Sequence, residues 1–149
     1  MKTLLLILIF FIAGCASPID WKEKTVHDII SKTTKNKHVR AITQFEVKSV
    51  GVASGTESGR WYLNSGLNYR SSFSLNVHLT PKVVSQFSQK YNIKNEAELL
   101  GKKIKVKGTA LAKTYCVKFG CPVRVNQNTP EMYLQTQLLI TDLNNISLQ

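Results

Sequence analysis

Apolar and polar residues alternate along much of the chain, with the period of two that is typical of a β-strand with one buried face. The pattern predicts five strands, which cover residues 39–53, 60–64, 69–79, 102–114 and 131–143. The third is the most regular, and its apolar side is formed by Phe73, Leu75, Val77 and Leu79. In the first strand the phase slips by one residue beside Gly51, which indicates a bulge and a sharp bend.

Two segments show helical spacing instead. Asp20 can cap a first helix that begins at Trp21, where apolar residues recur on one side. Thr80 and Pro81 begin a second helix, because threonine is a favoured cap and proline is tolerated in the first turn. A short helical turn is expected over residues 96–100. The predicted order is a short N-terminal helix, three strands, a helix, and two or three further strands.

The first fifteen residues differ from the rest because they contain one unbroken apolar run. Leu4–Ile12 follows the positive Lys2, and small residues follow the run. A basic start, an apolar run of this length and small residues at its end are typical of a secretory signal. The run is shorter than the roughly 20 apolar residues that span a bilayer. The sequence therefore predicts export.

The residues Ile12-Ala13-Gly14-Cys15 resemble the lipobox of bacterial lipoproteins. The resemblance implies cleavage before Cys15, diacylglycerol on the Cys15 sulfur, and acylation of the new amine by a fatty acid such as palmitate. The expected organisation is a signal peptide over residues 1–14, a lipidated tether over residues 15–20 and one domain over residues 21–149. Ala16-Ser17 resembles the start of lipoproteins sent to the outer membrane of Gram-negative cells, so we expect an anchor there that faces the periplasm. An ordinary signal peptide cut elsewhere and an uncleaved anchor remain alternatives.

The chain is strongly basic, with a net charge of +11. The signal segment contains one base and no acid, so the exported part carries +10. A basic surface favours anionic partners, which include nucleic acid, acidic lipid headgroups, lipopolysaccharide and acidic glycans. Charge also keeps an exported protein soluble, and it does not choose among these partners.

Lipidation of Cys15 would leave two cysteines, Cys116 and Cys121. An even number of cysteines in an exported chain indicates a disulfide, and Gly120 is available for the turn that closes this small ring. Loop entropy gives such a ring about 2 kcal/mol of stability. A zinc site is the alternative, but it needs two more ligands, and the three histidines show no paired spacing. No metal is therefore expected.

The order of elements and four short segments resemble bacterial members of the OB-fold group. These segments are Trp61–Asn64, Tyr69–Leu79, Leu99–Gly108 and Ile140–Asp142. The resemblance covers about residues 39–144. It implies a mainly β fold, a five-stranded Greek-key barrel with a helix between the third and fourth strands, a binding face and variable loops. It implies no particular ligand, because this fold hosts oligonucleotide, oligosaccharide and protein binders.

Residues for catalysis are sparse. The Gly-x-Ser-x-Gly and phosphate-loop motifs are absent, and only nine acidic residues are present. His27, His38 and His78 can all lie on the surface, with His78 on the polar side of a strand. The sequence therefore predicts neither an enzyme nor a cofactor, and a small envelope hydrolase is kept as an alternative.

Candidate binding residues come from two groups. Lys103, Lys105 and Lys107 point the same way from one strand, and the candidate stacking aromatics are Trp61, Tyr62 and Tyr69. A basic groove with aromatic platforms is typical of proteins that bind single-stranded nucleic acid. An ordinary solvated sheet face with Trp61 in the core explains the same pattern. The expected function is a membrane-anchored, non-catalytic module that binds another envelope component, such as an envelope protein, or an anionic ligand. The alternative is binding of single-stranded nucleic acid or an acidic glycan in DNA uptake, conjugation or attachment.

Overall fold

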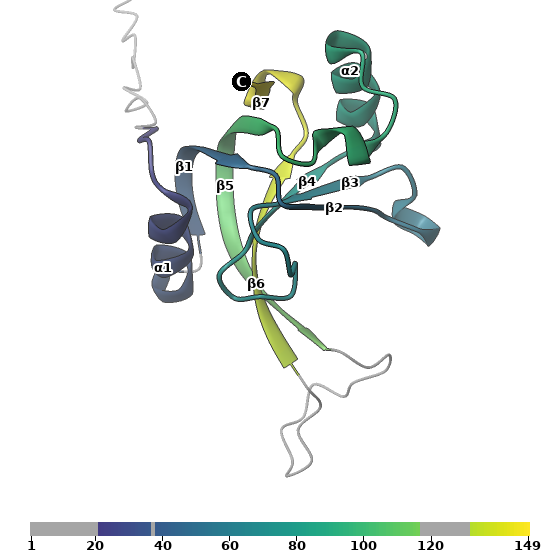
Figure 1. Ribbon diagram of the computed structural model, residues 1–149. Helices are drawn as coiled ribbons and strands as arrows, with labels where there is room; N and C mark the ends of the chain where they lie inside the picture. The colour runs from purple at the N-terminus through teal and green to yellow at the C-terminus, as the bar shows by residue number, and fades with distance from the viewer. Residues whose placement is uncertain (1–20, 37, 117–131) are drawn as a thin grey trace, which may run out of the picture.

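The computed structural model describes residues 21–36, 38–116 and 132–149. The described residues form two α-helices and seven strands around one core (Figure 1). The helices are α1 (Val26–Asn36) and α2 (Pro81–Tyr91). The strands are β1 (His38–Glu46), β2 (Ser49–Val52), β3 (Trp61–Asn64), β4 (Leu75–Leu79), β5 (Lys103–Cys116), β6 (Met132–Ile140) and β7 (Ile146–Leu148). The prediction of a mainly β fold with a helix between the third and fourth predicted strands is confirmed.

The signal peptide, the tether with Cys15, and Cys121 lie outside the described residues, so the lipid anchor and the disulfide stay predictions. The two helices that are described are both too short to cross a membrane.

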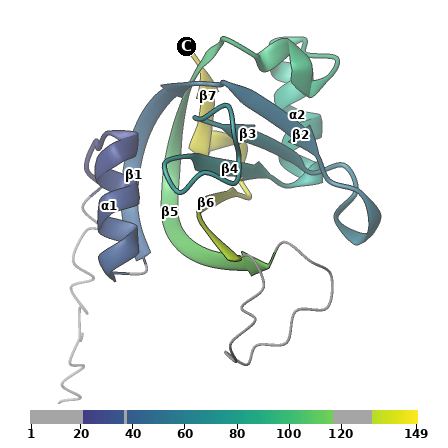
Figure 2. The ribbon, with the colours of Figure 1, turned by 60° about the horizontal axis from the view of Figure 1, so that its bottom comes forward.

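The strands form one mixed sheet in the order β1-β5-β6-β4-β3-β2, and β7 pairs with β5. Among the described strand pairs, β4 and β6 alone run parallel. The first and last strands of this order are consecutive in the chain, so the sheet curls back toward its own start (Figure 2). Helix α1 lies against β1 and β5, and α2 packs at the other end of the fold.

The predicted count of five strands is wrong, because the first predicted strand divides and β7 is added at the C-terminus. At the division the backbone N–H of Val47 donates to Lys102 O at 2.9 Å, and that of Lys48 donates to Asn64 O at 2.9 Å. The chain therefore changes partner from β5 to β3 within two residues. The predicted phase slip is present, but the bend lies at these two residues rather than beside Gly51.

The strand predicted over residues 69–79 is also too long, because only Leu75–Leu79 is extended. Residues 69–74 form turns, in which the N–H of Ser71 donates to Asn68 O and the N–H of Ser74 donates to Ser71 O. Serine and asparagine side chains also bond to this backbone, as they do between Ser71 Oγ and the N–H of Phe73. Such local bonds compete with a strand ladder. Phe73 is consequently 78% exposed instead of lying on the buried side.

Helix α1 begins at Val26 rather than at the predicted Trp21. Thr25 caps it, because Thr25 Oγ1 accepts from the N–H of Asp28 while the Asp28 carboxylate accepts from Thr25, which is a capping-box arrangement. The residues before the cap are extended along β1, where the N–H of Lys24 donates to Ile42 O and the N–H of Ile42 donates to Lys22 O.

The second helix and the short turn after it agree with the sequence prediction. In α2, Val83 and Phe87 are fully buried, and the helix ends at Asn92 in the left-handed conformation. The side chain of Asn95 then caps a short 3-10 helix over Glu96–Leu99.

The core is formed by the inward faces of the strands together with α1, α2 and the short 3-10 helix, which contribute Ile29, Phe87 and Leu99 among others. Its fully buried members include Leu63, Leu75, Val77, Leu79, Phe87, Leu99, Ile104 and Leu138. Gly108 of β5 packs directly on this core, since a Cβ there would come within 2.8 Å of Leu138 Cδ2. A larger residue at this position would therefore require the Leu138 side chain to shift.

Candidate functional site

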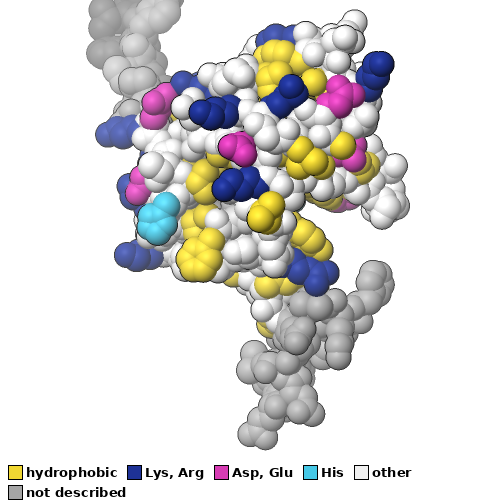
Figure 3. Space-filling model, viewed as in Figure 1, with side chains coloured by type: hydrophobic (Ala, Val, Ile, Leu, Met, Phe, Trp, Pro, Cys, Tyr) yellow, Lys and Arg dark blue, Asp and Glu magenta, His cyan; other side chains and the backbone are white. Residues whose placement is uncertain are grey.

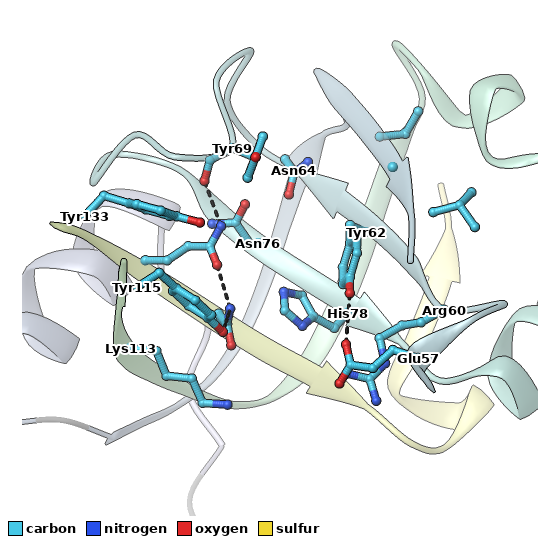
Figure 4. A pocket seen from close by; sticks show the side chains of 15 residues that line it. Glu57, Arg60, Tyr62, Asn64, Tyr69, Asn76, His78, Lys113, Tyr115 and Tyr133 are labelled. Carbon is cyan, nitrogen blue, oxygen red and sulfur yellow. Dashed lines mark hydrogen bonds and ion pairs between the residues drawn. The ribbon is translucent and has the colours of Figure 1, made fainter. Parts of the chain in front are cut away.

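A cavity of about 450 Å³ lies on the outer face of the sheet, over β2, β3, β4, β6 and the second half of β5 (Figure 4). This volume is in the range of small-ligand sites. Four tyrosines line it, so we call it the tyrosine groove: Tyr62, Tyr69, Tyr115 and Tyr133. Charged and polar side chains also line the groove: Glu57, Arg60, Asn64, Asn76, His78, Lys113, Gln135 and Gln137.

The floor of the tyrosine groove is a row of side-chain amides on three neighbouring strands. Asn64 of β3 pairs in register with Asn76 of β4, which pairs with Gln137 of β6. These side chains and Gln135 are at most 6% exposed although they belong to the outer face. Gln135 Nε2 donates to Tyr69 O at 2.9 Å, and Gln137 Nε2 donates to Gln135 Oε1 at 2.6 Å. The floor is therefore an ordered set of hydrogen-bonding groups rather than a mobile polar surface.

Aromatic rings form the walls. The rings of Tyr115 and Tyr133 stack with centroids 5.6 Å apart and an angle of 22°. The guanidinium of Arg70 lies 5.4 Å from the ring centroid of Tyr69 and 5.7 Å from that of Tyr133. On the other side Tyr62 contacts His78 edge to face, with centroids 4.6 Å apart. The groove thus offers flat aromatic surfaces at both ends.

The charges around the tyrosine groove are mostly positive. Glu57 is the one acidic residue among its described lining, and its carboxylate pairs with Arg60 at 2.8 Å and accepts from the Tyr62 hydroxyl at 3.1 Å. Arg60 Nε is buried without an acceptor among the described residues, and Lys113 is exposed at the rim. Burial, followed by the bond to Glu57, raises the pKa of Tyr62, so this phenol is neutral at physiological pH.

His78 is held neutral in the groove. Burial lowers its pKa from 6.5 to about 4, and the nearby positive charge of Arg60 acts in the same direction. The imidazole therefore adds no charge to the groove at neutral pH, although histidine is often charged just below it.

We expect the stability of the protein to fall as the pH is lowered from about 6.5 toward 4. In this window the unfolded chain binds a proton at His78 and the folded chain does not, so acid favours unfolding. Urea unfolding of wild type and His78→Gln at several pH values measures the effect. The variant should lose part of this pH dependence, whereas the exposed control His27→Gln should keep it. Equal pH dependence in wild type and His78→Gln would contradict the assignment.

The lysines predicted to form a binding face lie outside the tyrosine groove. Lys105 pairs with Glu23 at 2.6 Å, and Lys107 lies 5.0 Å from the ring centroid of Trp21. Together with Lys103 they occupy the first half of β5, and the extended N-terminal segment contacts Lys105 and Lys107. In Figure 3 the basic side chains are dispersed among acidic and apolar ones on the side of the molecule that it shows.

The predicted aromatics divide between the core and the groove. Trp61 is 7% exposed and belongs to the core. This agrees with the alternative interpretation, in which Trp61 packs inside and does not stack on a ligand. Tyr62, its neighbour on β3, points to the opposite face and lines the groove, and Tyr69 lines it from the loop before β4. The structure therefore brings together two of the six predicted binding residues.

The sequence prediction missed the rest of the site, although part of the signal is present. Lys113 and Tyr115 continue the same alternation as the three predicted lysines into the second half of β5. On β6 the outward side chains of Tyr133, Gln135 and Gln137 alternate with inward ones in the same way.

The described residues contain no cluster of three His, Cys, Asp or Glu side chains that could hold a metal ion.

Fold and site together define a small β domain with a ligand-sized groove on the outer face of its sheet. No protein-family model and no curated protein matches the chain. Among solved structures it is similar to a chain of the crystal structure of the S. pombe Stn1-ten1 complex, with 10% sequence identity and a TM-score of 0.39. The match covers 74% of this chain and 59% of that chain, so it spans about three fifths of that chain's length.

Proposed function

We propose that this protein is a non-catalytic binding module that holds single-stranded nucleic acid in the tyrosine groove. The observation that carries the proposal is the combination, on one sheet face, of aromatic walls, a floor of buried amides and a cationic rim. Bases stack on aromatic side chains, amides bond to base edges, and cations contact phosphates. Arg60 Nε supplies a buried donor that a phosphate oxygen can satisfy.

The strand order supports an OB-like fold as part of this proposal. When β1 and β2 are counted as one bent strand and β7 is left aside, the chain runs through three strands, α2 and two more strands. This is the order of the five-stranded Greek-key barrel. In that fold the face of the second and third strands binds oligonucleotides and oligosaccharides. These strands correspond to β3 and β4, which carry Tyr62, Asn64, Asn76 and His78.

Fluorescence anisotropy with a labelled single-stranded DNA of mixed sequence tests the proposal on the purified protein. Binding should weaken steeply with salt, because the phosphates release counterions. Lys113→Ser should weaken binding several-fold and reduce the salt slope by about one. The matched control is the triple serine variant at Lys103, Lys105 and Lys107, which removes three cations outside the groove and should retain the groove-dependent affinity. No binding at low salt, or equal competition by polygalacturonate, would contradict the proposal.

We also propose that the module is lipid-anchored in the bacterial envelope, at the periplasmic side of the outer membrane. The lipobox-like residues that end at Cys15, and Ala16-Ser17 directly after them, support this proposal. Membrane fractionation of wild type and Cys15→Ser tests it. Wild type should sediment with membranes and the variant should not, and mass spectrometry should find an acylated Cys15 at the N-terminus. Equal partitioning of the two forms would contradict the anchor.

Docking to another envelope protein is a second candidate function, favoured by the loop before β4. Leu67 is 82% and Phe73 is 78% exposed there, and aromatic residues such as phenylalanine are enriched in protein interfaces. A photo-crosslinking residue placed at position 73 in intact cells tests the idea. A specific adduct with one envelope protein is the expected result, and the absence of any adduct would argue against it.

A further inference from the structure

Two asparagines in the floor of the tyrosine groove have fixed orientations, and the first is Asn76. Its Nδ2 lies 3.1 Å from Ser74 O and 3.3 Å from Thr136 O. Both partners are backbone carbonyls, which can only accept, so the atom facing them must be the amide nitrogen. Asn76 Oδ1 consequently points away from these two carbonyl oxygens.

Asn64 is oriented by a similar argument. Its Nδ2 lies 3.2 Å from Ser49 Oγ, and Ser49 Oγ donates its proton to Gly66 O at 2.8 Å. The serine hydroxyl has one proton, so toward Asn64 it can only accept. The atom of Asn64 that faces the serine is therefore its nitrogen, and Asn64 Oδ1 faces away from it.

Both amide oxygens are buried acceptors that no donor of the described residues satisfies. Asn64 is 4% and Asn76 is 1% exposed, and both line the tyrosine groove. A buried polar atom without a partner destabilises the folded state, so such atoms are rare in proteins and need an explanation. A ligand group that donates hydrogen bonds to the two oxygens would provide this explanation.

The two oxygens belong to directly paired residues of neighbouring strands, and Figure 4 shows the two side chains next to each other. Adjacent acceptors are best matched by adjacent donors. A cationic ligand is disfavoured, because Arg60 and Lys113 line the same groove and only Glu57 offsets them. The matching group is therefore a neutral pair of N–H donors.

We infer that Asn64 and Asn76 make the tyrosine groove selective for guanine among the bases of a single strand. This inference rests on the proposed function. The base-pairing edge of guanine presents a ring N–H beside an amino group, which are two adjacent donors. Thymine and uracil present one ring N–H between two carbonyl oxygens, and these oxygens would face the asparagine oxygens. Adenine and cytosine present one amino group beside an acceptor, so they rank between guanine and thymine.

The test uses the full chain and labelled oligothymidine nonamers whose central base is guanine, hypoxanthine, adenine, cytosine or thymine. The guanine nonamer should bind about tenfold or more tightly than the all-thymine one, since a matched pair of base contacts discriminates by that order. Hypoxanthine lacks the amino group of guanine and keeps its ring N–H. The hypoxanthine nonamer should therefore bind several-fold more weakly than the guanine nonamer.

Variants connect the selectivity to the two oxygens. Asn64→Ala removes one of the two acceptors, so it should lower the ratio of guanine to thymine affinity several-fold while binding of the thymine nonamer persists. Asn64→Asp keeps an acceptor and should keep a preference for guanine. Asn36→Ala, on an exposed position of α1, is the matched control. Circular dichroism establishes folding, and the wild-type series alone decides the matter if a variant does not fold.

Each outcome has a distinct meaning. Equal affinity of wild type for all five nonamers would overturn the guanine selectivity and leave the proposed function standing, as would a preference for thymine. Binding of none of them would overturn the proposed function itself.

Discussion

Replacing Phe87 by alanine is expected to lower the free energy of unfolding by about 3–5 kcal/mol. The Phe87 side chain is fully buried, and its ring contacts that of Tyr91 with centroids 4.7 Å apart. It anchors α2 to the core, so truncation removes a large apolar surface and leaves a cavity that the strands cannot collapse to fill. Urea unfolding followed by circular dichroism measures the change, which should shift the midpoint with little change in slope.

Gln86→Ala is the matched control for Phe87→Ala. Gln86 is the preceding residue of the same helix and is exposed, so its replacement should change the free energy of unfolding by no more than about 0.5 kcal/mol. Similar losses in the two variants would mean that α2 does not pack on the core as described.

The double replacement Tyr62→Leu and Tyr133→Leu is expected to weaken binding of single-stranded DNA by on the order of a hundredfold. Each stacked base contributes about 1–3 kcal/mol through its aromatic partner, and these two rings lie on opposite walls of the groove. Leucine keeps apolar volume but offers no flat ring. Anisotropy titrations at one fixed salt concentration give the ratio of dissociation constants.

The control for the tyrosine variants is Phe73→Leu, which removes an exposed aromatic ring that does not belong to the lining of the groove. It should leave the affinity within about twofold. If Phe73→Leu weakened binding as much as the double variant, the nucleic acid would bind to the loop before β4 rather than to the groove.

Local patterns predicted the elements of this fold well where one face is buried. The alternation in β5 placed Ile104 and Val106 inside, and the threonine and proline at the start of α2 fixed that boundary. The phase slip in the first predicted strand was also a true signal. It could not reveal that the chain changes partner there, because the partners, Lys102 and Asn64, lie far away in sequence.

The binding site was less predictable, because its floor is created by pairing of distant strands. Asn76 reaches Thr136 across the parallel pair of β4 and β6, which are sixty residues apart in the chain. An asparagine on the polar side of an alternating strand is expected to face solvent, yet Asn76 is 1% exposed between β3 and β6. The sequence also could not show which of Trp61 and Tyr62 lies in the core and which lines the groove. Adjacent strand residues point to opposite faces, and the strand register decides which face is covered.

If Cys15 carries the proposed lipid anchor, the extended residues before α1 determine where a ligand would lie relative to the membrane surface. Residues 22–24 are fastened to Ile42 of β1, which is paired with Lys107 near the middle of β5. The tyrosine groove lies farther along β5, at Tyr115, about 25 Å of strand away. A bilayer that held the N-terminus would therefore meet the α1 side of the domain first. The groove would stand clear of the headgroups and open toward the surrounding fluid, where a long strand could thread past without touching lipid.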